Sequence, residues 1–270
     1  EQRSAVRALA RRLYMPTYRR LGWEPSVKGQ EDGESTLLRA AVLEHLALVV
    51  EDRRVRRAAV RHAHAYLGHG WRGDGAMHPE SLDANLRATA LAVAIQEGDA
   101  AFFEKVLALL FATDDATLRE HLLAALGAVR APALALRARQ LALDPRLRIN
   151  EMNRPLWGQL RMSETRTDAW EWLLASYDQL VERIGPFRAG YLPYMGRFFC
   201  DPEGAAAVDA FFSAEVPAGG SEGGSAGRSL ARIQTLPGGP RNLASVLEGV
   251  RLCAARVEAQ RESAREFFLR

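Results

Sequence analysis

The stretch TLLRAAVLEHLALVV, residues 36–50, decides the fold class of this chain. Its apolar positions recur at three- and four-residue spacing, and one such series comprises Leu37, Leu38, Ala41, Val42, His45, Leu46 and Val49. This spacing matches the 3.6-residue turn of an α-helix that buries one face. The same spacing returns in nearly every segment, and alternating strand-like runs are absent. We therefore predict an all-α protein.

Short polar or glycine-rich breaks separate the helical segments. They fall at residues 25–34, 68–79, 98–99, 113–115, 130–132 and 144–145, and Ser35, Ser81 and Asp115 are the N-caps that we expect. Connections this short force consecutive helices to lie antiparallel, and such pairs stack into a curved solenoid of the HEAT or armadillo kind. We predict one bowl-shaped helical-repeat domain over residues 1–270, with a flexible loop at about 217–240 and a last helix over 242–269.

The charge balance argues against a nucleic-acid partner. Acidic residues are interleaved with the arginines, and the net charge is only +3 over 270 residues. The densest basic run contains Arg53, Arg54, Arg56 and Arg57. It could face nucleic acid, but on a helix it is more simply a solvated face beside Val55, Ala59 and Val60, and we favour that interpretation.

The two cysteines, Cys200 and Cys253, lack the short, regular spacing of a disulfide-stapled or zinc-bound scaffold. We expect both to be reduced, buried thiols. No apolar run reaches the length of a membrane-spanning helix, and no signal arrangement opens the chain. We therefore expect a soluble chain with no membrane partner, and favour the cytoplasm.

The usual catalytic motifs are missing from the sequence. It contains no H-E-x-x-H zinc motif, G-x-S-x-G elbow, Walker loop, Rossmann fingerprint or C-x-x-C pair. His62, His64 and His69 form the nearest cluster, but a two-residue step on a helix points His62 and His64 to nearly opposite faces. We expect neither a catalytic residue nor a metal site in this chain.

The aromatic residues fall into two groups. Trp170 and Trp172, with Leu173, Leu174 and Tyr177, could form a ligand platform, yet their spacing on one amphipathic helix favours core packing. We also assign core positions in a C-terminal helix pair to Phe198, Phe199, Phe211 and Phe212. Exposed contacts are expected instead at Trp71, Tyr191 and Tyr194, in or beside loops.

An ordered series of short motifs runs along nearly the whole chain. It starts with LGWEP at residues 21–25 and continues with ANLR at 84–87, EGD at 97–99, LLAALG at 122–127, LRINEM at 147–152, AWEWL at 169–173, the span 199–212, and NLASVLEGVRLC at 242–253. In this order the series resembles the C-terminal domain of the aminopeptidase N family of zinc metallopeptidases, the endoplasmic-reticulum-aminopeptidase-like C-terminal domain.

The resemblance implies a helical, HEAT-like bowl that covers a catalytic domain and encloses the peptide chamber. Because the zinc helix and the G-A-M-E-N motif of that family are missing, it implies the non-catalytic C-terminal part of a longer zinc aminopeptidase. The implied partners are an upstream catalytic domain, which would hold the zinc, and a peptide substrate. This chain itself would need no cofactor. The alternative is a stand-alone HEAT-like scaffold that binds other proteins.

Three arginines lie near these motifs: Arg87, Arg148 and Arg166. A guanidinium that faces the bowl would bind the terminal carboxylate of a peptide in a bidentate way. Alternatively, each arginine forms an interhelical salt bridge, for instance Arg148 with Glu151, and we favour this second role.

Overall fold

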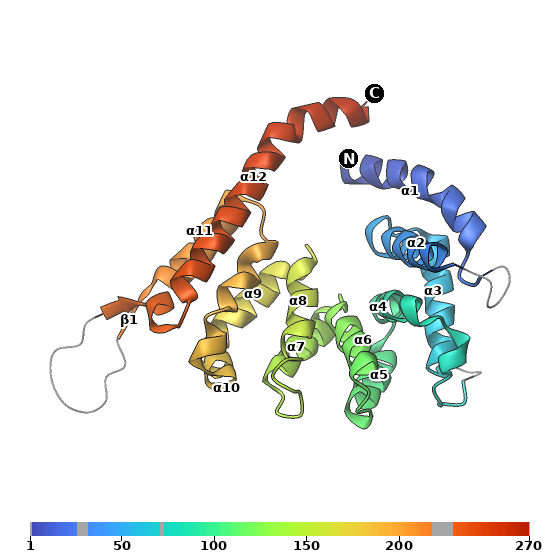
Figure 1. Cartoon of the computed structure of the whole chain (residues 1–270), viewed down its shortest axis with the longest axis horizontal. Helices are drawn as coiled ribbons and strands as arrows, with labels where there is room; N and C mark the ends of the chain where they lie inside the picture. The colour runs from blue at the N-terminus through green and yellow to red at the C-terminus, as the bar shows by residue number, and fades with distance from the viewer. Residues whose placement is uncertain (1, 26–31, 71–72, 218–228, 270) are drawn as a thin grey trace. The chain divides into compact units, whose positions relative to one another are not determined.

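The computed structural model of the chain describes residues 2–25, 32–70, 73–217 and 229–269. These residues divide into two compact units, Glu1–Ala138 and Arg139–Arg270, which are described one at a time (Figure 1). Helices make up nearly all of the regular structure, as predicted. In the described ranges no helix is long and apolar enough to cross a bilayer.

Unit 1 is built from consecutive, closely packed helices. The helix α1 packs on α2, α3 on α4, and α6 on both α4 and α5. Packing of a helix against the next one and the next but one is typical of stacked helix pairs in a solenoid. The elements are α1 (Gln2–Leu21), α2 (Gly33–Glu44), the π-helix η1 (His45–Val49), α3 (Arg53–Tyr66), the 3-10 turns η2 (Pro79–Ser81) and η3 (Ala84–Leu86), α4 (Arg87–Glu97), α5 (Ala100–Ala112), α6 (Ala116–Gly127), and α7 (Pro132–Gln140), which ends beyond the unit boundary.

Aspartates cap several helices of unit 1. Asp115 accepts a hydrogen bond from the backbone N–H of Leu118 at 2.7 Å, which confirms the predicted cap of α6. Ser35 is not a cap: Asp32, three residues earlier, accepts from its backbone N–H at 2.7 Å and starts α2 instead. Ser81 lies inside η2 and is not a cap either. A carboxylate suits a helix start because it complements the positive end of the helix dipole.

The stretch 36–50 folds as α2 followed by a π-helix. The backbone N–H of Val50 donates to the carbonyl of His45, five residues back, at 3.0 Å. The wider π-turn shifts the following side chains by one position relative to an α-helix. Val50 is therefore buried at 7% exposure, and Val49 is 52% exposed. The prediction that the whole apolar series faces the core is wrong for Val49, and also for Leu37 and Leu38, which lie exposed in the first two turns of α2.

Unit 2 contains a second set of helices and one short antiparallel β-pair that the sequence did not predict. The helix α8 packs on α9, and α12 packs on α11 and η5. The elements are η4 (Leu141–Leu143), α8 (Asn153–Arg161), α9 (Arg166–Ala175), α10 (Tyr177–Ala189), η5 (Leu192–Phe198), α11 (Pro202–Ser213), β1 (Glu215–Pro217), β2 (Ser229–Ala231), η6 (Arg232–Thr235) and α12 (Gly239–Leu269).

The flexible loop expected over 217–240 is replaced in part by regular structure. Residues 218–228 lie outside the described ranges. After them come β2, where Leu230 pairs with Val216 of β1, and the 3-10 turn η6. The last helix, predicted from residue 242, begins already at Gly239.

An aromatic cluster forms the centre of the unit 2 core, as predicted. Phe212 is fully buried, and its ring lies edge-on to those of Phe211, Tyr177 and Trp170 at centroid distances of 5.2, 6.1 and 6.5 Å. Arg232 of η6 covers the cluster: its guanidinium lies 4.0 Å from the ring centroid of Phe211. The other predicted core residues also belong to or pack against it: Trp172, Leu173, Leu174, Phe198 and Phe199.

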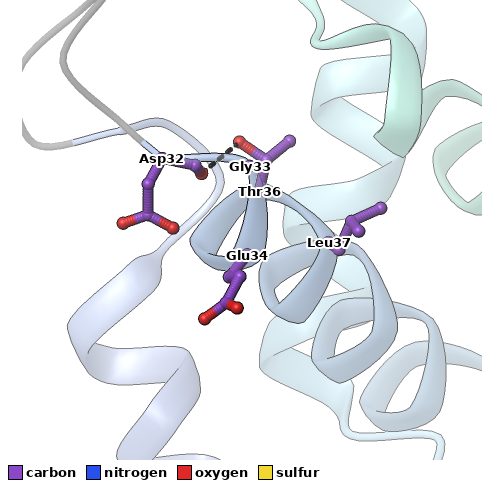
Figure 2. Close-up of a pocket in the computed structure, with 5 residues that line it drawn as sticks. All are labelled: Asp32, Gly33, Glu34, Thr36 and Leu37. Atoms are coloured by element: carbon purple, nitrogen blue, oxygen red, sulfur yellow. Dashed lines mark hydrogen bonds between the residues drawn. The ribbon is translucent and has the colours of Figure 1, made fainter.

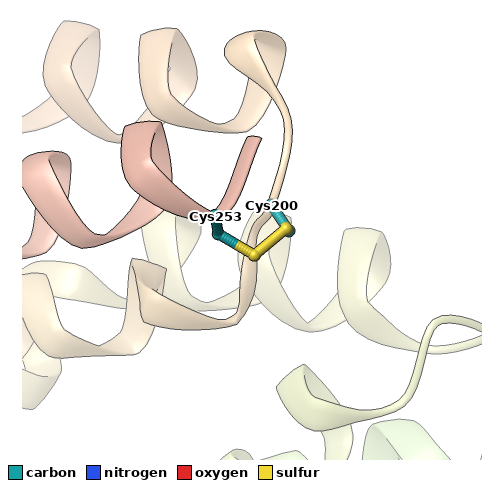
Figure 3. The surroundings of a disulfide bond; sticks show 2 residues. All are labelled: Cys200 and Cys253. Atoms are coloured by element: carbon teal, nitrogen blue, oxygen red, sulfur yellow. A yellow bond between two sulfur atoms is a disulfide. The ribbon is translucent and has the colours of Figure 1, made fainter. Parts of the chain in front are cut away.

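The two cysteines form a disulfide, which corrects the expectation of reduced, buried thiols. Cys200, between η5 and α11, is joined to Cys253 of α12, and their Cα atoms are 5.1 Å apart (Figure 3). Cys253 is exposed and Cys200 only half-buried. The sequence could not show this pair, because 53 residues separate its members and only packing of α12 brings them together.

Candidate functional site: an arginine-lined pocket

The first of the three arginines singled out in the sequence, Arg87, stabilises a loop. Its guanidinium donates to the carbonyl oxygens of Leu82, at 3.2 Å, and Pro79, at 2.9 Å. It also lies 5.1 Å from the ring centroid of Tyr66. These contacts tie the segment containing η2 and η3 to α3 and α4.

Arg148 and Arg166 likewise have partners within their own unit. Arg148 forms an ion pair with Glu151 at 3.7 Å, so the suggested partner is correct, but the pair lies in the segment before α8 and not between helices. Arg166 donates to the carbonyl oxygen of Leu160 at 2.9 Å, near the end of α8. Arg87 belongs to unit 1 and the other two to unit 2, and neither pocket described below includes any of the three. Peptide binding by these arginines stays a prediction.

The histidine cluster consists of packed rings. His62 stacks on Trp23 at 4.7 Å, while His64 lies 4.8 Å from His69 and 5.1 Å from Phe102, all between centroids. Partial burial lowers the pKa of both His62 and His64. In the described part of the chain no three metal-ligating side chains come together.

Of the three aromatic residues expected to make exposed contacts, one is exposed, one is half-buried and one lies outside the described residues. Tyr191 is 55% exposed, and its ring stacks on that of half-buried Tyr194 at 6.2 Å. Trp71 lies outside the described residues. Tyr191 is thus the exposed member of the stacked pair.

One pocket, of about 670 Å³, lies at the start of α2 (Figure 2). It is lined by Asp32, Gly33, Glu34, Thr36 and Leu37. Its polar groups serve the helix itself: the Thr36 hydroxyl donates to the Asp32 carbonyl oxygen at 3.1 Å, and hydrogen bonds from Ser35 lower the pKa of Asp32. Two carboxylates at a helix N-terminus stabilise the helix and repel other anions. We assign this pocket a structural role.

A second pocket, of about 480 Å³, lies within unit 1 and has a different character. We call it the arginine pocket. Its lining joins three separate parts of the sequence: Glu51, Arg53, Arg56, Arg57 and Val60 around the start of α3, Glu97 at the end of α4, and Arg130 after α6. Val60 is the single aliphatic residue of this lining. All of its lining residues except Val60 are therefore charged.

Glu51, which lines one side of the arginine pocket, has an unusual backbone conformation. Its φ angle of 57° makes it the one non-glycine residue with positive φ in the described chain. Two arginines fix its carboxylate: Arg7 at 2.8 Å and Arg130 at 2.5 Å. Residues kept in sparsely populated backbone regions are held there by their surroundings and cluster at functional sites.

Arg56 forms the floor of the arginine pocket. Its side chain is only 8% exposed and contacts the Glu97 carboxylate at 2.5 Å. It also donates to the carbonyl oxygen of Ala47, in the π-helix, and to the Gln96 side chain, both at 3.0 Å. The interpretation of the arginine run as a solvated face is thus wrong for Arg56, and correct for the exposed Arg53, Arg54 and Arg57. The carboxylate of Glu97, far away in sequence, allows this guanidinium to be buried.

The charges of the pocket do not cancel. Four guanidinium groups, those of Arg53, Arg56, Arg57 and Arg130, face two carboxylates, those of Glu51 and Glu97, so the lining carries a formal charge of +2 (4 − 2). Both carboxylates are already paired, as described above. Among the described residues no carboxylate pairs with Arg53 or Arg57. Sequence reasoning missed this site because its members become neighbours only through packing of α3, α4 and the segment after α6.

The acid dependence of stability provides a test of this charge network. Burial alone raises the pKa of Glu51, but the hydrogen bond from Arg130 and the charges of Arg130, Arg7 and Arg56 outweigh it and hold that pKa below its ordinary value of 4.5. A carboxylate with a lowered folded-state pKa stabilises the fold above its unfolded-state pKa, and this contribution disappears as the pH falls through the folded-state value.

We expect Glu51→Gln to lower the free energy of unfolding at neutral pH and to reduce its dependence on pH below 4.5. Urea unfolding curves at a series of pH values measure both effects. Glu44→Gln, at an exposed position on α2, is the matched control and should keep the wild-type pH profile. Identical acid profiles for Glu51→Gln and wild type would contradict the assignment.

Comparison with known proteins agrees with the ordered motifs of the sequence up to residue 212, whereas the last motif, at 242–253, lies beyond the match. No curated protein matches the chain. Residues 1–235, most of the chain, match the family described as the ERAP1-like C-terminal domain. This match spans the helices of unit 1 and extends through unit 2 up to η6. The chain therefore belongs to the ERAP1-like C-terminal domain family.

Proposed function

We propose that this chain is the non-catalytic C-terminal domain of a zinc aminopeptidase and contributes to substrate access and recognition around the peptide chamber. The observation that carries the proposal is the family match over residues 1–235. The all-helical architecture supports it. In this proposal the zinc ion, the nucleophilic water and the general base belong to an upstream catalytic domain, whose zinc would lower the pKa of the attacking water.

The test compares this chain with the full product of its gene. Both are assayed on chromogenic amino-acid amides with added zinc, and the longer protein is also assayed after chelation. We expect hydrolysis only by the longer protein and its loss on chelation. Hydrolysis by this chain alone, or an inactive longer protein, would contradict the proposal.

A recognition role for Arg87, Arg148 and Arg166 is tested in the longer protein. If one of them binds the carboxylate of a peptide, its replacement by glutamine should raise KM for long peptides and leave KM for amino-acid amides unchanged. Amidated peptides distinguish this role from a structural one, because they lack the carboxylate and should show the same KM in both proteins. Equal changes for free and amidated peptides would assign the arginine to stability alone.

One observation favours a second candidate, a protein-binding scaffold. The half of α12 that follows Cys253 exposes large apolar side chains, with Val257 at 48% and Phe267 at 64%. This candidate takes these side chains as part of one contiguous apolar surface, which is typical of interaction sites. An inactive longer protein in the amide assay would favour this candidate.

A further inference from the structure

The arginine pocket carries an inference that goes beyond the family assignment and does not depend on a catalytic half. Arg53 and Arg57 are both exposed, line the pocket and lie one helical turn apart on α3. Like charges at this spacing repel each other and destabilise the helix. The carboxylate of Glu51 contacts Arg7 and Arg130, and one oxygen of Glu97 contacts Arg56, so neither group forms an ion pair with Arg53 or Arg57.

Buried groups of the same pocket add a second observation. The charged side chain of Arg56 is nine-tenths buried, at 8% exposure, and forms part of the lining. The Nε atom of Arg130 is buried without a hydrogen-bond partner. An unsatisfied buried donor costs free energy, so natural proteins supply it with a partner from the protein, water or a ligand. Arg56 and Arg130 are paired with glutamates, so the unbalanced charge of the pocket lies on Arg53 and Arg57 at its rim.

The size and chemistry of the pocket restrict what could fill it. A volume of about 480 Å³ lies in the range of small-molecule sites. Val60 and the stems of the arginines add apolar surface, but the charged ends of the side chains are what distinguish this pocket. Guanidinium groups are planar forks that match the oxygen pairs of carboxylates and phosphates. The formal charge of +2 fits a ligand with two negative charges.

We propose that the arginine pocket binds a small anion that carries at least two negative charges on phosphate or carboxylate groups, through Arg53 and Arg57 at its rim. Arg56 and Arg130 add positive potential from below and remain paired with their glutamates. The Glu51–Arg130 and Glu97–Arg56 pairs preorganise the pocket, because they fix its walls before the anion enters.

Isothermal titration calorimetry at low ionic strength tests the proposal, because salt screens such charges strongly. Pyrophosphate probes the phosphate class, citrate the polycarboxylate class, and acetate serves as the singly charged reference. We expect saturable binding of pyrophosphate, citrate or both by the wild-type chain, and much weaker binding of acetate. The tighter of the two polyanions identifies the class of the natural ligand.

Two double variants of α3 decide whether the binding belongs to the pocket. Arg53→Gln/Arg57→Gln removes both rim charges and should weaken polyanion binding by roughly 100-fold, since each lost charged hydrogen bond weakens binding about tenfold or more. Arg54→Gln/Arg61→Gln removes the same charge from exposed positions on the same helix that do not line the pocket, and should bind as wild type does.

Three results would overturn the proposal. These are the absence of polyanion binding by wild type, equal affinity for acetate and for the polyanions, and equal loss of affinity in the two double variants. The last result would show a general attraction to a basic helix. Because all four substituted arginines are exposed, both variants should fold, and their circular dichroism spectra should match that of wild type. None of these results depends on peptidase activity, so they are independent of the test of the proposed function.

Discussion

Replacement of Cys200 and Cys253 together by serine should lower the free energy of unfolding by about 4 kcal/mol, the chain-entropy value for a loop of this length. The bond links positions 53 residues apart, and the loop that it closes contains α11, the β-pair, η6 and the first half of α12. Without the bond this loop is no longer closed in the unfolded chain, whose conformational entropy therefore rises. The free energy of unfolding falls as a result.

Urea unfolding followed by circular dichroism measures this loss. Reduction of the wild type supplies the internal control, because it breaks the same bond without changing the sequence. The reduced wild type and the double serine variant should unfold at the same urea concentration, and the oxidised wild type at a higher one. If oxidised and reduced protein unfold together, the bond does not stabilise the fold.

Phe212→Ala should cost about 3–5 kcal/mol of stability, the usual range for truncation of a buried phenylalanine. The ring has no exposed surface and lies at the centre of the unit 2 core, where it contacts the rings of Trp170, Tyr177 and Phe211. Its removal leaves a cavity that these rigid neighbours cannot close. Loss of dispersion contacts and of edge-to-face ring pairs adds to the lost transfer free energy.

Phe187→Ala is the matched control for this prediction. Phe187 belongs to the same unit and is 68% exposed, so its truncation should change stability by less than about 0.5 kcal/mol. Denaturant unfolding of the two variants under identical conditions gives the comparison. Similar losses for Phe187→Ala and Phe212→Ala would show that the aromatic cluster is not the centre of the core.

Much of the fold could be predicted from local patterns. The apolar spacing of Val42 and Leu46 predicts a helix from neighbouring residues alone, and Asp115 marks a helix start because a cap acts within three residues. The π-turn at His45–Val49 could not be predicted in this way. The π-turn shifts the side chain of Val49 by one position around the helix, and the residues before it do not predict such a turn.

The arginine pocket could not be predicted from patterns of neighbouring residues. The helical spacing places Arg56 beside Ala59 and Val60, but only the carboxylate of Glu97, 41 residues away, explains why a charged side chain can be buried there. The Arg130–Glu51 pair spans 79 residues. Long-range pairs of this kind depend on tertiary packing, which a single sequence does not record.

The disulfide bears on the cellular location that we expected. Disulfides persist in oxidising compartments and are rare in the reducing cytoplasm. The bond between Cys200 and Cys253 is therefore a reason to test the cytoplasmic location, which stays a prediction. The spacing of the two cysteines did not predict the bond, so it provided no information about the compartment either.

The packing of α12 has a consequence for how this protein can be shortened. The family match ends at residue 235, yet α12 begins at Gly239 and places Leu243, Val246 and Val250 in the core of unit 2. A chain cut at the family boundary would lose this helix, leave the facing side of α11 and η5 open to water, and release Cys200 as a free thiol. The family boundary is thus a limit of sequence similarity and not of folding, and a shortened version must retain α12 at least through Cys253.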